Sequence, residues 1–277
     1  MLEVLPIDMI QAHFVQHLSK GSRGPAPKVE LWEIVHAILY KLKSGVHWHL
    51  LPIKSLIISV EISWFTIYHH YLKWCKDGSW QLAWEACLEE SKPSLDLSTV
   101  QLDGTHSLAK RGGEAVGYQG RKKAKTTNIL CLTDKRGTIV SWGKPVSGNH
   151  NDLFEKEGQV THMLDQMKRA DISIDGLFLN ADAGFDAKGL RKILDKEGIT
   201  LNVAPNKRNG SNIDSDIIFD PQMYQDRFVI ERTNAWMDSF RTLLVRQDTT
   251  SSSWEAWHFM ASTCWHIKNQ INQKEKL

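Results

Sequence analysis

The chain has 277 residues, of which 42% are hydrophobic, a formal net charge of +2, and four cysteines without C-x-x-C spacing. This length suits one large domain or a small domain with a larger one, and the cysteine pattern excludes a disulfide framework and a cysteine-based zinc site. No apolar run approaches the roughly 20 residues of a membrane span, and no secretory signal is visible, so we expect a cytoplasmic protein that does not enter a membrane.

The first part of the chain predicts helices. Apolar residues at steps of three and four predict a helix over 29–42, and aromatic-rich segments predict two more over 59–75 and 80–88. Three short helices with an aromatic core are typical of a helix-turn-helix-like DNA-binding domain, which we expect over 1–93. A helical bundle without a role in DNA binding fits the same pattern.

From residue 94 onward, strands and helices alternate. We expect strands over 99–102, 128–133, 138–146, 176–181 and 200–204, helices over 153–168, 187–197, 227–246 and 253–269, and an irregular segment over 206–223. This order resembles that of a ribonuclease H-like domain, an α/β fold with a mixed sheet and flanking helices. We expect this domain over 94–277.

Two aspartates follow apolar runs and precede glycines. Asp103 ends the first predicted strand of this domain, and Asp182 ends a later one. Strand ends of an α/β sheet are where catalytic groups usually gather. An aspartate that only caps a turn is the ordinary alternative for either position alone, but two matching positions favour a catalytic role.

A third carboxylate lies on the long helix predicted over 227–246. Polar residues recur there at steps of three and four, so they share one face of a continuous helix: Tyr224, Arg227, Glu231, Asn234, Asp238 and Arg241. This polar stripe can turn Glu231 toward the strand ends. A solvated face with an Arg227–Glu231 ion pair is the ordinary alternative.

Three carboxylates suit phosphodiester chemistry. Such reactions use two divalent ions about 3.5–4 Å apart, and Mg²⁺ prefers carboxylate and phosphate oxygens. We expect Asp103 to bridge both ions, Asp182 to hold one and Glu231 to hold the other. Tyr224 and Arg227 are placed to bind phosphate oxygens, which arginine can do through two hydrogen bonds.

Several motifs in this order resemble the DDE transposases of prokaryotic insertion sequences. Tyr224, Arg227 and Glu231 fit the first three positions of the signature Tyr-x2-Arg-x3-Glu-x6-Lys, and further segments resemble other blocks of this family: 37–52, 102–106, 148–152 and 180–186. The resemblance implies a ribonuclease H-like catalytic domain that uses Asp103, Asp182 and Glu231.

The resemblance also implies an activity. It implies cleavage of double-stranded DNA at the terminal inverted repeats of the element, followed by 3′-OH strand transfer into target DNA. Two Mg²⁺ ions are the implied cofactors, with Mn²⁺ able to substitute, and a homodimer or larger assembly is the implied state on DNA. We therefore expect the protein to associate with the nucleoid when it is bound to DNA.

One position departs from the signature. Its final lysine is expected at position 238, where this chain has Asp238. Arg241, one turn later on the predicted stripe, can supply the missing positive charge. If it does not, phosphate binding is weakened.

A basic block lies before the first hairpin of the sheet region. Residues 101–150 contain 9 basic and 3 acidic residues. We expect DNA backbone contacts from Lys110 and Arg111 and, around Tyr118, from Arg121, Lys122, Lys123 and Lys125. A solvated loop is the alternative. His150 and Asp152 are candidates for lining the site, although His150 fits a turn equally well.

Two other functions compete with an active transposase. The first is a catalytically inactive, transposase-derived DNA-binding protein, which Asp238 favours and the intact Asp, Asp and Glu set opposes. The second is a ribonuclease H-like nuclease that acts in repair or on RNA. The N-terminal helices and the Tyr224, Arg227 and Glu231 spacing favour the transposase.

Overall fold

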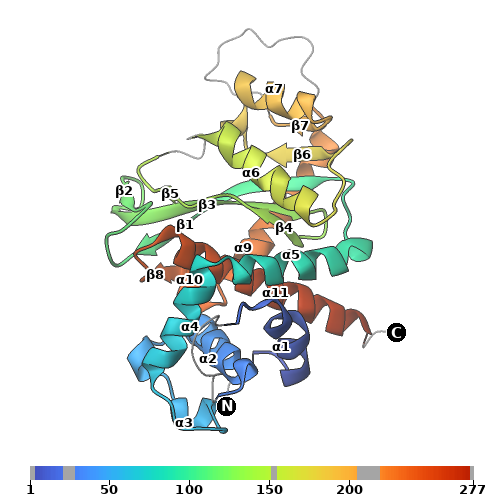
Figure 1. Ribbon diagram of the computed structural model, residues 1–277. Helices are drawn as coiled ribbons and strands as arrows, with labels where there is room; N and C mark the ends of the chain where they lie inside the picture. The colour runs from blue at the N-terminus through green and yellow to red at the C-terminus, as the bar shows by residue number, and fades with distance from the viewer. Residues whose placement is uncertain (1–3, 21–28, 151–154, 205–218, 275–277) are drawn as a thin grey trace. The chain divides into compact units, whose positions relative to one another are not determined.

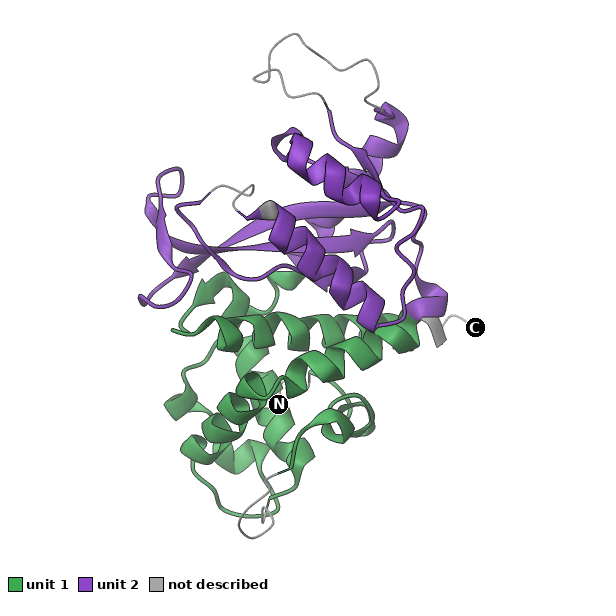
Figure 2. Ribbon diagram, turned by 45° about the horizontal axis from the view of Figure 1, so that its top comes forward, with its two compact units in different colours: residues 1–91, 237–277 green, residues 92–236 purple. Residues whose placement is uncertain are grey.

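The structure is a computed structural model that describes residues 4–20, 29–150, 155–204 and 219–274 (Figure 1). Contacts divide the chain into two compact units (Figure 2). We call residues 1–91 with 237–277 the helical unit and residues 92–236 the sheet unit. The contacts thus group residues 237–277 with the N-terminal helices, whereas the sequence grouped them with the catalytic domain. The division into domains at residues 93 and 94 stays a prediction.

The helical unit consists mainly of helices. Its elements are α1 (Ile7–His13), η1 (Val15–His17), α2 (Leu31–Ser44), η2 (Trp48–Leu50), α3 (Ile53–Leu56), α4 (Trp64–Lys76), α5 (Ser79–Ser91), α10 (Arg241–Leu244), β8 (Val245–Arg246) and α11 (Ser251–Lys274). The three expected N-terminal helices correspond to α2, α4 and α5, and the expected last helix corresponds to α11. No helix in the described part of the chain has both the length and the hydropathy that crossing a bilayer requires.

Aromatic side chains form the core of the helical unit. Tyr71 of α4 stacks on Trp257 of α11 with ring centroids 4.4 Å apart, and its hydroxyl donates to the Ser253 carbonyl at 2.6 Å. Trp84 of α5 stacks on Phe259 of α11 at 5.2 Å. Because such rings bury large apolar areas, they explain why α11 packs with helices that precede it by more than 150 residues.

The sheet unit alternates strands and helices. Its elements are η3 (Lys92–Ser94), β1 (Val100–Ala109), β2 (Gly117–Gln119), β3 (Ala124–Asp134), β4 (Ile139–Trp142), β5 (Val146–Ser147), α6 (Lys156–Arg169), β6 (Phe178–Ala181), η4 (Ala183–Phe185), α7 (Lys188–Lys196), β7 (Thr200–Asn202), α8 (Pro221–Tyr224), η6 (Gln225–Phe228) and α9 (Val229–Met237).

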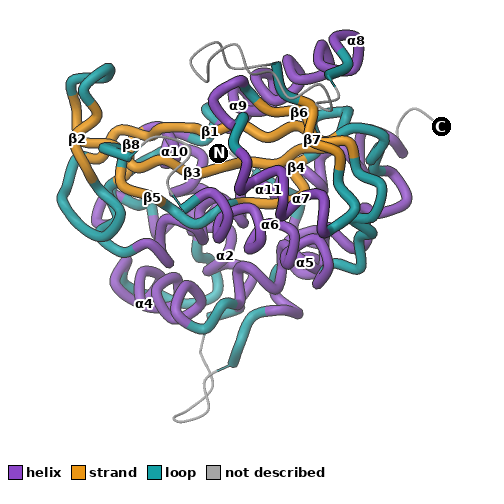
Figure 3. The backbone as a smooth tube through the Cα atoms, turned by 90° about the horizontal axis from the view of Figure 1, so that it is seen from above, coloured by secondary structure: helices purple, strands orange, loops and turns teal. Residues whose placement is uncertain are grey.

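The strands form a mixed sheet in the order β2-β3-β1-β6-β7 (Figure 3). β3 runs antiparallel to β1, and β4 and β5 pair with β3, whereas β6 is parallel to β1 and β7 is parallel to β6. An antiparallel meander followed by parallel strands on the other side of β1 is the strand order of a ribonuclease H-like domain. The expected fold class, with an N-terminal helical region, is confirmed.

One face of the sheet is closed by α6 and α7. Ser141 of β4 donates to the Met163 carbonyl of α6 at 2.9 Å, and α7 packs on β7. The apolar side chains of Leu102, Leu132 and Leu179 are buried. Alternation along the strands then directs the neighbouring residues, including Asp103, to the other face.

Two strand expectations need correction. β1 continues to Ala109, although we expected it to end at residue 102, because β3 pairs with it through its whole length. This pairing outweighs the turn propensity of Asp103-Gly104. The strand expected over 138–146 is split into β4 and β5, and Gly143 between them donates its N–H to the Leu130 carbonyl.

The single helix expected over 227–246 is wrong. η6 leads into α9, which ends at Met237, and Phe240 has extended backbone angles before α10 begins at Arg241. Phe240 and Leu243 are buried. Burial of these apolar residues accounts for a break that the unbroken polar periodicity conceals.

Candidate active site

Asp103 lies inside β1 and is half-buried. Its cross-strand partner is Cys131 of β3, so the two side chains share one face of the sheet. Burial raises the pKa of the Cys131 thiol, and the Asp103 carboxylate raises it further. The thiol therefore stays protonated, and the ionisable oxygen ligand at this position is the carboxylate.

Asp182 follows β6 directly and is exposed. Its carboxylate accepts a 2.6 Å hydrogen bond from the Ala183 N–H at the start of η4. β1 and β6 are parallel, and their last described pair is Leu102 with Ala181. Asp103 and Asp182 are the next residues along, and neighbouring strands lie about 4.8 Å apart, so the two aspartates stand side by side.

Hydrogen bonds identify the face that these aspartates occupy. Asn180, two residues before Asp182, donates from its side chain to Gln101, two residues before Asp103. The same Asn180 amide donates to the Met223 carbonyl of α8 at 2.9 Å. Because side chains two residues apart on a strand share a face, both aspartates lie on the face that α8 and η6 cover.

Glu231 follows on α9. This helix buries Ile230, Thr233 and Met237 and leaves Glu231 exposed on its flank. The Thr233 hydroxyl donates to the Gly137 carbonyl at 2.7 Å, which fixes α9 to the turn between β3 and β4. Glu231 therefore lies on α9, which follows directly after α8 and η6, the two elements that cover the aspartate face.

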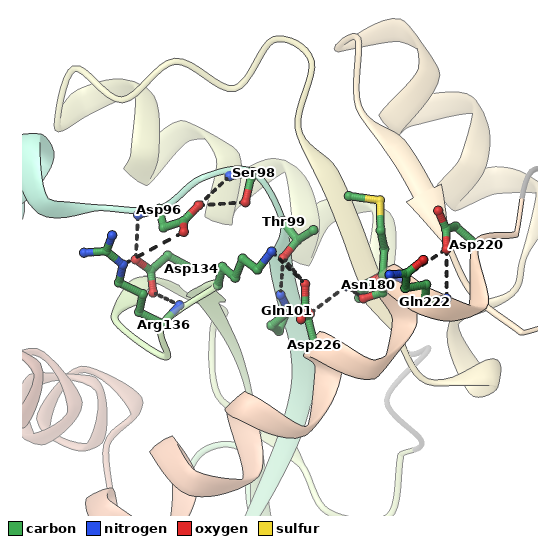
Figure 4. Close-up of polar contacts among 12 residues, drawn as sticks. Asp96, Ser98, Thr99, Gln101, Asp134, Arg136, Asn180, Asp220, Gln222 and Asp226 are labelled. Atoms are coloured by element: carbon green, nitrogen blue, oxygen red, sulfur yellow. Dashed lines mark hydrogen bonds and ion pairs between the residues drawn. The ribbon is translucent and has the colours of Figure 1, made fainter.

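The β3–β4 turn that receives α9 is itself tightly held. The buried Asp134 carboxylate accepts N–H hydrogen bonds from Asp96 and Arg136 (Figure 4) and from Thr138. Burial raises the pKa of Asp134 more than these bonds lower it. Gly137 has a φ of +89°, and an added Cβ would lie 2.7 Å from the Thr233 hydroxyl. The turn thus needs glycine for both its backbone and its contact with α9.

Two aromatic rings lie near the Arg227 guanidinium. The guanidinium carbon lies 5.7 Å from the Tyr224 ring centroid and 5.5 Å from that of Phe228. The Arg227 Nε is buried and has no hydrogen-bond partner among the described residues. Tyr224 and Arg227 thus lie in α8 and η6, the segment that covers the aspartate face.

The carboxylate oxygens of Asp103, Asp182 and Glu231 suit a hard divalent cation. The three side chains are not close enough together to bind one ion as a group. Among the residues whose placement is described, no three His, Cys, Asp or Glu side chains come close enough to hold a metal ion. The strand register brings together Asp103 and Asp182, while Glu231 stays outside that pair. Carboxylate oxygens beside a protonated thiol match Mg²⁺ better than a thiophilic metal.

Arg241 is not part of α9. It begins α10 in the helical unit, where an added Cβ on Gly45 would lie 2.9 Å from the Arg241 Cβ. Asp238 also lies beyond the end of α9. Neither residue shares a helix with Glu231, so the single polar stripe that we expected to join them is wrong.

The basic block forms an exposed hairpin of β2 and β3. Tyr118 pairs across the strands with Lys125, and Arg121, Lys122 and Lys123 occupy the turn. All five side chains are exposed, and the Lys122 ammonium donates to the His106 carbonyl at 3.0 Å. We call residues 117–125 the basic hairpin. Lys110 and Arg111, just after β1, are exposed too.

The two remaining candidates are only partly placed. His150 is half-buried, and its N–H donates to the Ser147 carbonyl next to β5. Asp152 lies outside the described residues. Their roles stay predictions.

Three buried amides on the aspartate face were not predicted: Gln101, Asn180 and Asn202. Each stands between two apolar residues of a strand-forming run. A polar side chain inside an apolar strand is the sequence signal that marks them.

Comparisons with known proteins agree with this geometry. Residues 8–84 match a family described as "Putative transposase of IS4/5 family", and residues 94–264 match the "Transposase DDE domain". The second match covers more than half of the chain. The chain belongs to the DDE transposase family. The transposase is thus a DNA-cleaving and strand-transferring enzyme that uses divalent metal, and the expected family and activity are confirmed.

Solved structures similar to the transposase include two complexes of another transposase. They are the "Mos1 transposase paired-end complex with left transposon end" and the "Crystal structure of the Mos1 Strand Transfer Complex". Both are 12% identical to this chain, and each match covers 89% of it. The matches cover 80% and 79% of the Mos1 chains, with TM-scores of 0.29 and 0.30. These scores are low, so the fold assignment depends on the strand order. No curated protein matches the chain.

Proposed function

We propose that the transposase cuts double-stranded DNA at the terminal inverted repeats of an insertion sequence and transfers the freed 3′-OH to target DNA. One observation supports this proposal above all. Parallel β1 and β6 carry Asp103 and Asp182 to adjacent positions, on the face covered by the segment that leads to Glu231.

The three carboxylates act together in this proposal. Asp103, which is flanked by strands on both sides, would hold divalent metal together with Asp182 and Glu231. Bound ions in such a site activate the attacking oxygen and stabilise the leaving oxygen. Mn²⁺ substitutes for Mg²⁺, because both ions accept carboxylate and phosphate oxygens.

Tyr224 and Arg227 bind the phosphate that is cut. The two rings beside Arg227 restrict its guanidinium, so less conformational entropy is lost when it binds. Its two terminal nitrogens can donate to two phosphate oxygens.

DNA outside the cut phosphate is held by other surfaces. The basic hairpin contacts the DNA backbone through Arg121, Lys122, Lys123 and Lys125, and the N-terminal helices recognise the ends of the element. Two copies act together as a homodimer or larger assembly, because two ends have to be joined. The enzyme works in the cytoplasm on the DNA of the nucleoid.

Metal-dependent cleavage tests this function directly. Purified protein is incubated with a labelled duplex that carries its own element's end, with Mg²⁺, Mn²⁺ or EDTA. We expect nicking at the element end in either metal and none in EDTA. Asp103→Ala, Asp182→Ala and Glu231→Ala should each abolish nicking and retain DNA binding. Asp186→Ala, next to η4, is the matched control and should retain nicking.

Two results would overturn the proposal. Nicking that persists in Asp103→Ala would remove the carboxylate assignment. Specific binding of the end without nicking in the unmodified protein would instead indicate an inactive DNA-binding derivative, for which Asp238 in place of lysine is the first cause to test by Asp238→Lys.

A further inference from the structure

Three amide side chains lie inside the sheet unit where apolar residues are usual. Gln101 of β1, Asn180 of β6 and Asn202 of β7 are each 0% exposed. They occupy adjacent strands in the register Gln101 with Asn180 and Asn180 with Asn202. The three amides therefore form a row across the sheet, which we call the amide row; Figure 4 shows two of its members, Gln101 and Asn180.

The amide row is connected by directed hydrogen bonds. Asn202 Nδ2 donates to Asn180 Oδ1 at 2.8 Å, Asn180 Nδ2 donates to Gln101 Oε1 at 2.9 Å, and Gln101 Nε2 donates to the Thr99 hydroxyl at 2.9 Å. The Thr99 hydroxyl donates in turn to the Asp226 carboxylate at 3.3 Å. The donor direction is the same at every step and ends on a charged acceptor.

The row also binds the backbone that covers it. Asn180 Nδ2 donates to the Met223 carbonyl, Asn202 Nδ2 donates to the Asp220 carbonyl at 3.0 Å, and Asn202 Oδ1 accepts from the Asp220 N–H at 2.8 Å. Every side-chain nitrogen and oxygen of the three amides therefore has a partner. A buried amide without partners is destabilising by roughly 1–3 kcal/mol, so this complete pairing specifies one arrangement.

The covering backbone is the segment that carries the phosphate-binding residues. Met223 comes directly before Tyr224, and Asp226 comes directly before Arg227. Asp220 begins this segment, and α9 with Glu231 follows it. On the strand side, Gln101 and Asn180 each precede an aspartate of the site by two residues on the same face. The amide row thus joins both halves of the active site through buried contacts.

We propose that Gln101, Asn180 and Asn202 are positioning residues of the transposase, which set the place of Arg227 and Glu231 relative to Asp103 and Asp182. This inference rests on the proposed function. None of the three touches DNA or the reacting atoms. Their effect is on geometry, and a displacement of about 1 Å at a reacting centre can cost about 100-fold in rate.

Asn180→Asp tests the proposal with almost no change of shape. It replaces the nitrogen that donates to Gln101 and to Met223 by an oxygen, so both acceptors lose their donor. We expect the cleavage rate kcat to fall about 100-fold, while KM for the element end changes less than about 3-fold. Gln222→Glu, an exposed amide-to-carboxylate change in α8, is the matched control and should keep both constants.

A second variant separates positioning from folding. Replacing all three amides by leucine removes the hydrogen bonds between them together with their donors and acceptors. When both partners of a buried hydrogen bond are replaced by apolar groups, the free energy of unfolding often changes little. We expect this triple variant to fold, as judged by its thermal unfolding, and to cleave slowly. A folded triple variant or a folded Asn180→Asp protein that cleaves at the full rate would overturn the inference. Failure of both to fold would overturn it too, because the amides would then serve the fold itself.

The two proposals fail separately. If Asp103→Ala still cleaves, the proposed function is wrong whatever the amides do. If Asp103→Ala is inactive and Asn180→Asp is fully active, only the inference about the amide row is wrong.

Discussion

Arg227 shows how one side chain is prepared for an anion. A guanidinium that lies against two rings gains cation–π attraction and loses freedom before any ligand binds. Its terminal nitrogens can therefore bind a phosphate with a smaller loss of conformational entropy than those of a freely moving side chain.

Arg227→Lys should therefore behave as a strong loss of function. A lysine keeps the charge but lacks the planar set of donors, so two directed hydrogen bonds to phosphate become one. We expect the affinity for the element end, measured by fluorescence anisotropy, to fall about 10-fold or more, as charged hydrogen bonds contribute about 1.5–3 kcal/mol. Arg232→Lys, an exposed neighbour on α9, is the control. Equal affinities for the two variants would contradict a specific role for Arg227.

Single residues also show what the sequence can and cannot reveal. Asp103 and Asp182 were predictable, because an apolar run ending in a carboxylate and a glycine is visible locally. The amides were not, since the partner of Asn180 lies 79 residues away at Gln101, and no local pattern gives that register. Whether a buried polar residue is satisfied is a property of the pairing of strands.

At the scale of elements, the presence of a helix or strand was easier to predict from the sequence than the residues at which it begins and ends. The strands around Asp103 and Asp182 and the flanking helices were found, because their hydrophobic periodicity is local. The end of α9 was not, because polar residues continue at helical spacing past Met237 while buried Phe240 demands a turn. Tertiary burial decided the boundary, and with it the loss of Arg241 from the predicted stripe.

Because α9 contacts the β3–β4 turn at Gly137, we expect a substitution of this glycine to affect both stability and cleavage. In Gly137→Ala, the added Cβ would meet Thr233 and Val229 at a φ of +89°. We expect destabilisation of more than about 1 kcal/mol in urea unfolding, together with slower cleavage, because α9 carries Glu231. Gly176→Ala has a similar φ of +75° and open space around it. It should show the backbone cost alone, with unchanged cleavage, and a reversed order would refute this role of the turn.

The basic hairpin predicts a change in salt dependence. Replacing Arg121, Lys122 and Lys123 by alanine should lower the slope of log K for DNA against log salt by about 3, because each phosphate contact contributes about 0.9. The control removes three exposed lysines of α7 instead: Lys188, Lys192 and Lys196. Titrations from low to high salt compare the two. Equal slopes would show that the hairpin does not contact the DNA backbone.

At the scale of the whole molecule, residues from both ends of the chain form one helical unit. The stacking of Tyr71 on Trp257 and of Trp84 on Phe259 makes the C-terminal helix part of the same core as the N-terminal helices. The sequence did not predict this, because the partner of each helix is set by packing between residues far apart in the chain. Removal of α11 would therefore expose the N-terminal core.

This shared core predicts that acid weakens the fold. His258 of α11 is buried and hydrogen-bonded to the Trp254 carbonyl, and burial lowers the pKa of its ring to about 4, with a smaller effect from Arg246. The unfolded chain takes up this proton near pH 6.5, whereas the folded protein does so only near pH 4. Stability is therefore complete above about pH 6.5, and roughly 3 kcal/mol is lost as the pH falls to 4.

Urea unfolding at pH 7, 5.5 and 4.5 measures this loss. His258→Gln should flatten the dependence on pH, because the neutral amide binds no proton in either state. Some dependence should remain, since burial also lowers the pKa of His70. His69→Gln removes an exposed histidine from the same unit and is the matched control. If His258→Gln loses as much stability between pH 7 and 4.5 as the unmodified protein, protonation of this buried ring does not drive acid unfolding.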